Sequence, residues 1–405
     1  MRGTAQLPAS KSESNRALIL RALAGGGQLA NLSDAHDTQL MQRLLAAAPG
    51  TDQLDAEDAG TVMRFLTAYL AVTGWRGRLT GTARMQQRPI GVLVEALREL
   101  GAVVDYEGVG GFPPLRFGGF APQRQAVEAP ELAVRGDISS QYISALLMIA
   151  PLLPAGLVVQ LTGPVGSRPY INMTLDLMSR FGAGVRADAS GAIGISPRHY
   201  QPADYEVESD WSAASYWYAL VALAAPGSAI RLTGLRQQSS QGDQAIARLM
   251  APLGVATEFL GANVVQLTQT AVEPARLTSF DFADCPDLAQ TVAVVAAALG
   301  QALVLTGLES LRIKETDRIA ALQNELGKFG AMLAEVSPGR FQVQHSRPFR
   351  VSGQPVATYH DHRMAMAFAP LALRGPLQIE APDVVRKSYP HFWRELRQIG
   401  FSATS

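Results

Sequence analysis

The sequence predicts an α/β protein with two domains, each assembled from similar units. Three observations carry this prediction: the length and apolar content of the chain, a helix–glycine–strand joint that recurs along it, and polar motifs at the starts of the expected helices. At roughly 150 residues per domain, 405 residues indicate two or three domains. A hydrophobic content of 47% is ample for cores of that size and excludes a disordered chain.

Charge and cysteine content exclude several classes of protein. The 35 basic and 35 acidic side chains give zero formal net charge, which disfavours a protein held to nucleic acid by phosphate contacts. Cys285 stands alone, so the chain has no intrachain disulfide framework and no cysteine-rich metal site. The most apolar stretch, residues 143–159, contains two prolines and a glycine, so it predicts a buried helix, a turn and a strand rather than a membrane span. We expect a soluble, cytoplasmic protein without a secretory signal.

An amphipathic helix that ends in a hydrophobic residue and a glycine, followed by a strand-like run, occurs five times. The leucines of each helix form one buried stripe, and the glycine supplies a left-handed cap that turns the chain into the strand. Such joints are common in α/β proteins, so the evidence is their recurrence at similar steps. Residues 42–55 look like a degenerate sixth copy, which would give three units in each half. The joints lie at residues 95–107, 176–188, 248–260, 324–336 and 394–403, with glycines Gly101, Gly182, Gly254, Gly330 and Gly400.

Short polar motifs stand just before, or in the first turn of, most predicted helices. Free backbone N–H groups and the helix dipole favour anions at such positions. Hydroxyl groups beside lysine or arginine suit phosphate, although ordinary N-capping is the better explanation of any one motif taken alone. This group contains Lys11, Ser12, Arg16, Gly60, Arg88, Ser139, Ser140, Gln141 and Ser167.

The densest charged motif is LRIKETDRI, at residues 311–319. Its spacing predicts that Lys314 and Arg318 share a helix face with Glu315 between them, although a solvated run of charges would look the same. Asp287 precedes a very apolar helix, where its carboxylate could cap the helix or act as a base. Together the motifs predict a basic pocket that suits more than one strongly anionic ligand and keeps two acids for proton transfer. The cations are Lys11, Arg16, Arg88, Lys314, Arg318, Arg363 and Lys387, and the acids are Asp287 and Glu315.

In their order along the chain, the motifs resemble the signatures of EPSP synthases, the 3-phosphoshikimate 1-carboxyvinyltransferases. They are LPASKSESNRAL, DAGTVMR, QQRPIG, SSQYISALLM, SRPYI, QGD, LRIKETDR, DHRMAM and the Lys387 segment, and they run from Leu7 to Trp393. The resemblance implies the two-domain, inside-out α/β fold of enolpyruvyl transferases, with three βαβαββ repeats and buried parallel helices in each domain. It implies a shikimate-phosphate-side domain at 9–207, and a second domain at 1–8 and 208–405 that carries the catalytic Asp and Glu. The active site is then expected in the interdomain cleft, which closes on substrate.

The same resemblance implies the reaction. These enzymes transfer the enolpyruvyl group of phosphoenolpyruvate to the 5-hydroxyl of shikimate 3-phosphate and release phosphate. The reaction passes through a tetrahedral intermediate and uses no metal and no organic cofactor. We therefore expect the two small-molecule substrates as partners, no nucleic acid and no membrane, and a monomer.

Residue roles follow from the matched positions. Asp287 would take the 5-hydroxyl proton, Glu315 would protonate the methylene carbon and later remove a proton, and Lys11 would share that proton traffic. The residues matched to shikimate 3-phosphate are Lys11, Ser12, Arg16, Ser139, Ser140, Gln141, Ser167, Asp287, Ser310 and Lys314. Those matched to phosphoenolpyruvate are Lys11, Gly60, Arg88, Gln141, Arg318, Arg363 and Lys387.

Some positions depart from the family pattern. Ser310 and Asp58 stand where asparagine is usual, and Phe65 stands where proline is usual. The stretch between Asp34 and Asp58 is short, which predicts that one unit lacks a strand pair.

Three other functions compete with this interpretation. The sister enolpyruvyl transferase that acts on UDP-N-acetylglucosamine usually carries a mobile-loop cysteine, which is missing near residues 84–91. A non-catalytic relative would only bind phosphate-bearing ligands, and the presence of Asp287, Glu315 and Lys11 argues against it. A nucleic-acid end-processing protein of the same superfold is disfavoured by the zero net charge.

Overall fold

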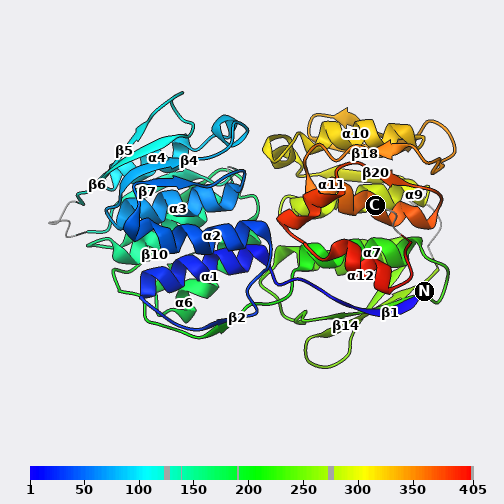
Figure 1. The fold of residues 1–405 in the computed structure, drawn as a ribbon, viewed down its shortest axis with the longest axis horizontal. Coiled ribbons are helices and arrows are strands. Elements are labelled where there is room, and N and C mark those ends of the chain that lie inside the picture. The colour runs from blue at the N-terminus through cyan, green and yellow to red at the C-terminus, as the bar shows by residue number, and fades with distance from the viewer. Residues whose placement is uncertain (123–127, 138, 189–190, 272–277, 403–405) are drawn as a thin grey trace. The chain divides into compact units, whose positions relative to one another are not determined.

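The computed structural model describes residues 1–122, 128–137, 139–188, 191–271 and 278–402 (Figure 1). The chain divides into two compact units. Unit 1 comprises Met1–Ser10, Asp34–His36 and Glu208–Ser405, and unit 2 comprises Lys11–Ser33 and Asp37–Val207. The short return to unit 1 at Asp34–His36 was not predicted from the sequence. No described helix is long and apolar enough to cross a membrane.

Four four-stranded sheets share one topology, two in each unit. The first two strands of each sheet are parallel, and the last two form an antiparallel hairpin whose final strand pairs with the second strand. One helix precedes the second parallel strand and another leads into the hairpin; in the repeat of β1, unit 2 is inserted between that strand and its helix α7. This element order is the predicted βαβαββ unit, and it occurs twice in each unit of the fold.

The complete repeats of unit 2 are β3 (Gln53–Asp55), α3 (Gly60–Val72), β4 (Arg76–Thr80), α4 (Gly91–Glu99), β5 (Ala102–Tyr106) and β6 (Leu115–Phe120), then β7 (Glu131–Arg135), α5 (Ser140–Ile149), β8 (Leu157–Thr162), α6 (Arg168–Arg180), β9 (Val185–Ala187) and β10 (Ala192–Ile195). Those of unit 1 are β1 (Arg2–Gln6), α7 (Trp211–Leu223), β12 (Ala229–Thr233), α8 (Ile246–Met250), β13 (Val255–Phe259) and β14 (Val264–Gln269), then β15 (Thr278–Asp281), α9 (Ala289–Ala298), β16 (Leu303–Thr306), α10 (Arg318–Lys328), β17 (Ala331–Ser337) and β18 (Arg340–His345). Short 3-10 helices in these repeats are η2 (Met85–Gln87), η3 (Ala150–Leu152), η4 (Gly242–Ala245), η5 (Ala251–Leu253), η6 (Pro286–Leu288) and η7 (Glu309–Ile313).

The third repeat of each unit is reduced to a parallel strand pair and two helices. The expectation of three complete repeats per domain was therefore wrong in this detail, although the short stretch between Asp34 and Asp58 predicted it for one copy. In unit 2 the chain runs from α2 through η1 into β3, which already begins the next repeat; in unit 1 no strand follows Gly400 among the described residues. The elements are β11 (Tyr205–Glu206), α1 (Lys11–Ala24), β2 (Leu29–Ala30), α2 (His36–Ala47) and η1 (Ala48–Gly50) in unit 2, and β19 (Pro355–Val356), α11 (His362–Phe368), η8 (Ala369–Leu373), β20 (Gln378–Ile379), η9 (Pro382–Lys387) and α12 (Phe392–Gln398) in unit 1.

The helix between the two parallel strands of each repeat is buried. In α7, α9 and α11 nearly every side chain is inaccessible to solvent, and the three helices pack on one another. In unit 2, α3 and α5 are buried in the same way and pack on each other, and α1 packs on α3. The strands alternate between buried and exposed residues, so each sheet covers the helices with one face and meets solvent with the other. The helices are inside and the sheets outside, as predicted.

The predicted glycine caps are confirmed. Gly101, Gly182, Gly254, Gly330 and Gly400 all have positive φ, between 86° and 101°. Strands β5, β9, β13 and β17 follow the first four of them closely. Residues 143–159 form the end of α5, η3 and the start of β8, which is the predicted helix, turn and strand.

Replacing a cap glycine should destabilise the fold, whereas replacing a helical glycine should not. A Cβ at Gly101 would lie 2.5 Å from the carbonyl oxygen of Ala121 at a φ of 101°, so Gly101→Ala should lower the stability by at least about 1–2 kcal/mol. Gly327 lies in α10 with open space around its Cβ position, so Gly327→Ala should raise the stability by about 0.5–1 kcal/mol. Urea unfolding midpoints measure both effects; a lowered midpoint for both variants would contradict the distinction.

Candidate active site

The starts of three helices in unit 1 meet at the carboxylate of Asp287. Asp287 lies on η6, directly before α9, and accepts hydrogen bonds from two arginines. Nη1 of Arg318, the first residue of α10, is 2.8 Å from Oδ1, and Nη2 of Arg363, on α11, is 2.7 Å from Oδ2. Each carboxylate oxygen therefore has its own guanidinium partner.

Arg318 is the most heavily paired cation of this group. It is 2% exposed and also donates to Glu315 Oε2, 2.9 Å away, and to Asp361 Oδ2, 2.6 Å away. Burial lowers the pKa of Arg318, but Asp361, Glu315 and Asp287 more than offset this and hold it above its ordinary value. Asp361 also caps α11 by accepting the backbone N–H of Arg363. We call Asp287, Glu315, Arg318, Asp361 and Arg363 the Asp287 cluster.

The cations around Asp287 decide its protonation state. Burial raises the pKa of this carboxyl, but Arg363, Lys314 and Arg318 outweigh burial and hold the pKa well below its usual range. Asp287 is therefore ionised at neutral pH. It is also a weak base for as long as both guanidinium groups remain on its oxygens.

The segment between η7 and α10 differs from the prediction. Helix α10 begins only at Arg318, with Asp317 as its N-cap, whereas Lys314 follows η7 in a non-helical conformation. The prediction that Lys314 and Arg318 share a helix face was wrong, because the side chain of Asp317 satisfies the first N–H groups of α10 and fixes its start. The structure nonetheless brings Glu315 to Arg318, and Lys387 Nζ on η9 lies 3.8 Å from Glu315 Oε1. Ser310 lies on η7.

A second set of contacts holds Arg363 on the side away from Asp287. Its Nη1 donates to the hydroxyl of Tyr216, 3.2 Å away, and its Nη2 donates to Ser212 Oγ, 3.3 Å away. Both partners lie on α7. Ser212 in turn donates to Oδ2 of Asp243 on η4. Burial raises the pKa of Tyr216 to about 12, so its hydroxyl stays neutral.

In unit 2, the predicted residues again gather at helix starts. Lys11 is the first residue of α1, and its Nζ is 2.9 Å from Oδ2 of the buried Asp37 on α2. Gly60 is the first residue of α3, and a Cβ there would lie 2.7 Å from the guanidinium of Arg88. The absent side chain of Gly60 therefore leaves the space that Arg88 fills.

The start of α5 lies beside the start of α3. Gln141 Nε2 donates to the hydroxyl of Thr61, 3.0 Å away. Ser139 is the N-cap of α5 and accepts the backbone N–H of Gln141, and Ser140 is the first helical residue. Ser167 is the N-cap of α6, in the left-handed conformation with φ 55°.

Arg16 is placed differently from the other predicted ligands. It lies within α1, is 2% exposed, and donates to Thr174 Oγ1, the carbonyl of Ser12, Ser144 Oγ and the carbonyl of Tyr170. These bonds use four of the five N–H donors of a guanidinium. Burial lowers the pKa of Arg16 to about 10. The side chain thus ties the starts of α1, α5 and α6 together, and its contact with a substrate stays a prediction.

Four residues that support the site were not identified from the sequence: Asp37, Arg64, Asp243 and Asp361. Asp361 and Asp243 stand in the DHRMAM and QGD motifs, but their partners are distant in sequence and only the fold reveals them. Arg64 is buried and holds the carbonyl of Pro89, next to Arg88, at 2.9 Å. For Asp37, which lies in the first turn of α2, the sequence motifs gave no signal.

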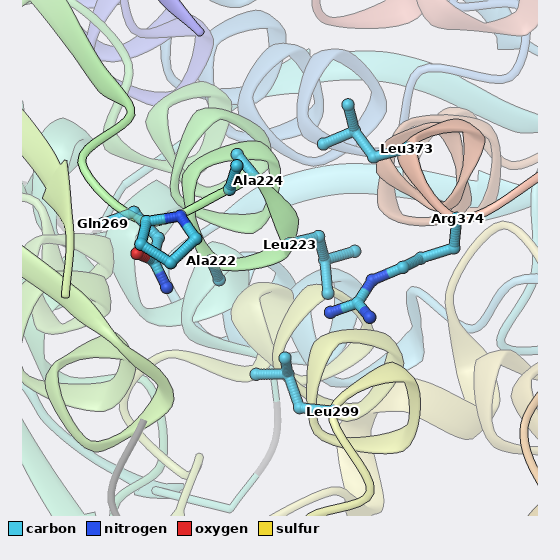
Figure 2. Close-up of a pocket in the computed structure, with 9 residues that line it drawn as sticks. Ala222, Leu223, Ala224, Gln269, Leu299, Leu373 and Arg374 are labelled. Carbon is cyan, nitrogen blue, oxygen red and sulfur yellow. The ribbon is translucent and has the colours of Figure 1, made fainter. Parts of the chain in front are cut away.

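A pocket of about 390 Å³ lies at the other ends of α7 and α9 (Figure 2). Leu223, Leu299 and Arg374 are among its lining residues. It contains none of the predicted site residues, and α9, with 10 residues, separates it from Asp287 by roughly 15 Å.

The pH dependence of stability should reveal the charge of Asp287. The pKa of Asp287 is lower in the folded protein than in the unfolded chain. The contribution of the ionised carboxylate to the free energy of unfolding is therefore complete above the unfolded pKa of about 3.9 and is lost as the pH falls below it. Asp287→Asn should therefore be less stable than the unmodified protein at pH 6, with a gap that narrows as the pH falls towards 3.5. Urea unfolding midpoints of both proteins measure this gap, and a gap independent of pH would contradict the assigned charge.

Comparisons with known sequences identify the family. The family described as EPSP synthase (3-phosphoshikimate 1-carboxyvinyltransferase) matches residues 45–396. A 3-phosphoshikimate 1-carboxyvinyltransferase of Bacteroides fragilis (strain YCH46) is 50% identical over 404 residues, covering 99% of this chain and 96% of that protein. One from Burkholderia vietnamiensis is 39% identical over 422 residues, covering 96% and 95%.

Solved structures confirm the predicted fold class. An EPSP synthase from Acinetobacter baumannii gives a TM-score of 0.77 at 21% identity, covering 99% of this chain and 96% of that chain. The enolpyruvyl transferase NikO from Streptomyces tendae gives 0.73 at 15% identity, covering 98% and 94%. The family match and the identity over nearly the whole length show that this chain belongs to the EPSP synthases, the 3-phosphoshikimate 1-carboxyvinyltransferases.

Proposed function

We propose that this chain transfers the enolpyruvyl group of phosphoenolpyruvate to the 5-hydroxyl of shikimate 3-phosphate and releases phosphate. Family membership supports the reaction, and the observation that carries it at the level of residues is the carboxylate of Asp287 held between Arg318 and Arg363. The residues of both units act on the same two substrates. We also propose a cytoplasmic location, for which the single cysteine is the supporting feature, and a monomeric state.

The cations of the site match the charge of the substrates. Each substrate carries a carboxylate and a phosphate of about −1.5 to −2 charge. Arg318 and Arg363 offer planar forks that bind carboxylate or phosphate oxygens in two places at once, and Lys314 and Lys387 add point charges. In unit 2, Arg88 beside Gly60 and the amide of Gln141 complete the phosphoenolpyruvate ligands. Ser12, Ser139, Ser140 and Ser167, with Lys11 and Arg16, bind shikimate 3-phosphate, as does Ser310 of unit 1.

Asp287 accepts the proton of the 5-hydroxyl. An anion that binds to Arg318 and Arg363 competes for the N–H donors that now hold Asp287. The pKa of Asp287 therefore rises when phosphoenolpyruvate is present, which makes the carboxylate a stronger base only when the reaction partner is bound. Asp287 is therefore ionised and weakly basic in the free protein, and becomes basic enough to accept the proton once phosphoenolpyruvate is bound.

The two steps balance in protons. In the addition, the 5-hydroxyl oxygen bonds to C2 of phosphoenolpyruvate, its proton moves to Asp287, and Glu315 gives a proton to C3. In the elimination, the bond between C2 and the phosphate oxygen breaks and Glu315 takes a proton back from C3. The proton on Asp287 leaves with the phosphate, so both carboxylates return to their first state. Arg318 and Lys387, which flank Glu315, favour its ionised form, so they promote the transfer of its proton to C3 in the addition and stabilise the carboxylate until it takes a proton back in the elimination.

A phosphate-release assay with the purified protein tests the function. We expect release of inorganic phosphate when both shikimate 3-phosphate and phosphoenolpyruvate are present, and none when either is omitted. Release that does not depend on shikimate 3-phosphate, or no release at all, would overturn the proposal.

Removing either acid should slow turnover even under conditions in which the variants remain folded. Asp287→Asn and Glu315→Gln should each lower kcat by about 10²–10⁴-fold, because each removes a group that transfers a proton. Glu309→Gln is the matched control, since Glu309 is an exposed acid on η7 close to the same segment. Turnover of Asp287→Asn within threefold of the control would remove Asp287 from the role of base.

A further inference from the structure

Asp243 is a buried acid that the proposed mechanism does not use. It is 2% exposed, and its Oδ2 accepts the hydroxyl of Ser212. Its Oδ1 is buried and has no hydrogen-bond partner among the described residues. An ionised carboxylate with one buried oxygen that accepts no hydrogen bond is energetically unfavourable, because the low-dielectric interior does not replace its hydrogen bonds to water.

A continuous set of hydrogen bonds links Asp243 to the reacting carboxylate. Ser212 donates to Asp243, Arg363 Nη2 donates to Ser212 at 3.3 Å, and the same Nη2 donates to Asp287 at 2.7 Å. These residues come from η4, α7, α11 and η6, which pack together at the helix starts of unit 1. Any change in the charge of Asp243 therefore acts on Arg363.

The charged groups around Asp243 differ in sign. Burial is the largest influence on the pKa of Asp243 and raises it, and the negative charges of Asp287 and Asp210 raise it further. Arg363 and the hydrogen bond from Ser212 lower it. The result is a pKa of about 7. Cys285, on the adjoining segment before η6, is buried and stays a neutral thiol because burial raises its pKa, and Arg248 of α8 acts on that thiol. Arg363 is thus the cation that is linked to Asp243 through Ser212 and that lowers the pKa of Asp243.

We propose that Asp243 is a positioning residue for Arg363 and that it takes up a proton when a substrate anion binds to that arginine. The identity of the anion, phosphoenolpyruvate, rests on the proposed function. Asp243 acts through Ser212 and contacts no reacting atom, so it has no place in the bond-making steps.

The physical reason is competition for one cation. An ionised Asp243 is stabilised by Arg363, and an anion bound to Arg363 cancels that stabilisation. The protonated form of Asp243 then prevails, which leaves Arg363 to face Asp287 and the substrate. By linkage, proton binding and anion binding strengthen each other equally. The affinity for phosphoenolpyruvate should accordingly fall as the pH rises through the pKa of Asp243.

Steady-state kinetics between pH 6 and 9 test this inference. For the unmodified protein, the KM for phosphoenolpyruvate should rise above about pH 7, by up to about tenfold per pH unit. In Asp243→Asn, whose amide resembles the neutral acid, that rise should be absent, with kcat and the KM for shikimate 3-phosphate within about threefold of the unmodified protein at pH 6. Asp281→Asn, which changes an exposed acid of β15 in the same unit, should keep the rise.

An equal rise in Asp243→Asn and in the unmodified protein would overturn the inference while leaving the enzymatic function intact. Ser212→Ala provides a second variant should Asp243→Asn fail to fold. It removes the hydroxyl that lowers the pKa of Asp243, so the acid stays neutral to a higher pH and the rise in KM should begin at a correspondingly higher pH.

Calorimetry with sulfate, an anion that does not itself titrate at this pH, tests proton uptake without turnover. Titrations at pH 7.5 in two buffers of different ionisation enthalpy count the protons bound with the anion. We expect net uptake in the unmodified protein and less in Asp243→Asn. Equal uptake in both would overturn the inference, whereas absence of turnover with the two substrates would overturn only the proposed function.

Discussion

Helices that are mostly apolar on all sides must be buried, and this requirement organises each unit. Helices α7, α9 and α11 carry few polar side chains, so they are stable only when sheets and other helices cover them. The charged and amide side chains of these helices lie at their starts, whereas α7 also carries hydrogen-bonded tyrosines further along. Hydrogen bonds show that these starts meet in unit 1 at Asp287 and in unit 2 around Gly60 and Gln141. Within each unit, the starts of several helices are thereby brought together, and their N–H groups favour anions there.

The pairing of arginines with carboxylates in the Asp287 cluster links the arrangement of the helices to the proposed reaction. Two arginines, both largely withdrawn from water, need anionic partners, and Asp287, Glu315 and Asp361 supply them within the protein. Removing one member of such a buried group is strongly destabilising because the remaining charge is left uncompensated. If a substrate anion replaces one of these carboxylates, the arginine that it binds keeps a negatively charged partner. In the proposed function, the cluster exchanges its carboxylates for substrate oxygens, and the proposed rise in the basicity of Asp287 follows from that exchange.

Local signals predicted much of the fold. The five joint glycines have the predicted positive φ because a left-handed cap at the end of a helix depends only on neighbouring residues. Motifs such as SSQYI and DAGTVMR start helices α5 and α3 as expected for the same reason. The start of α10 was misjudged, since spacing alone did not reveal that Asp317 is the cap. The reduced third repeats depend on pairings between distant strands, such as β11 with β2, which the sequence pattern indicated for only one copy.

The sequence predicted which residues form much of the site, but not which of them are hydrogen-bonded to one another. Asp287, Arg318 and Arg363 were all named from their motifs, yet nothing local indicates that both guanidinium groups bind one carboxylate. Asp361 and Asp243 were missed because their importance lies in contacts to Arg318 and, through Ser212, to Arg363. Arg16 shows the opposite effect: a motif residue with a predicted ligand role has most of its donors occupied by the core.

In the proposed reaction, this chain joins two anions rather than hydrolysing one of them. The most direct measurement combines ³¹P NMR and mass spectrometry of the products formed from equal amounts of shikimate 3-phosphate and phosphoenolpyruvate. Transfer predicts that the phosphoenolpyruvate signal is replaced by inorganic phosphate while shikimate 3-phosphate gains the mass of one enolpyruvyl group. Formation of pyruvate and phosphate with shikimate 3-phosphate unchanged would contradict it.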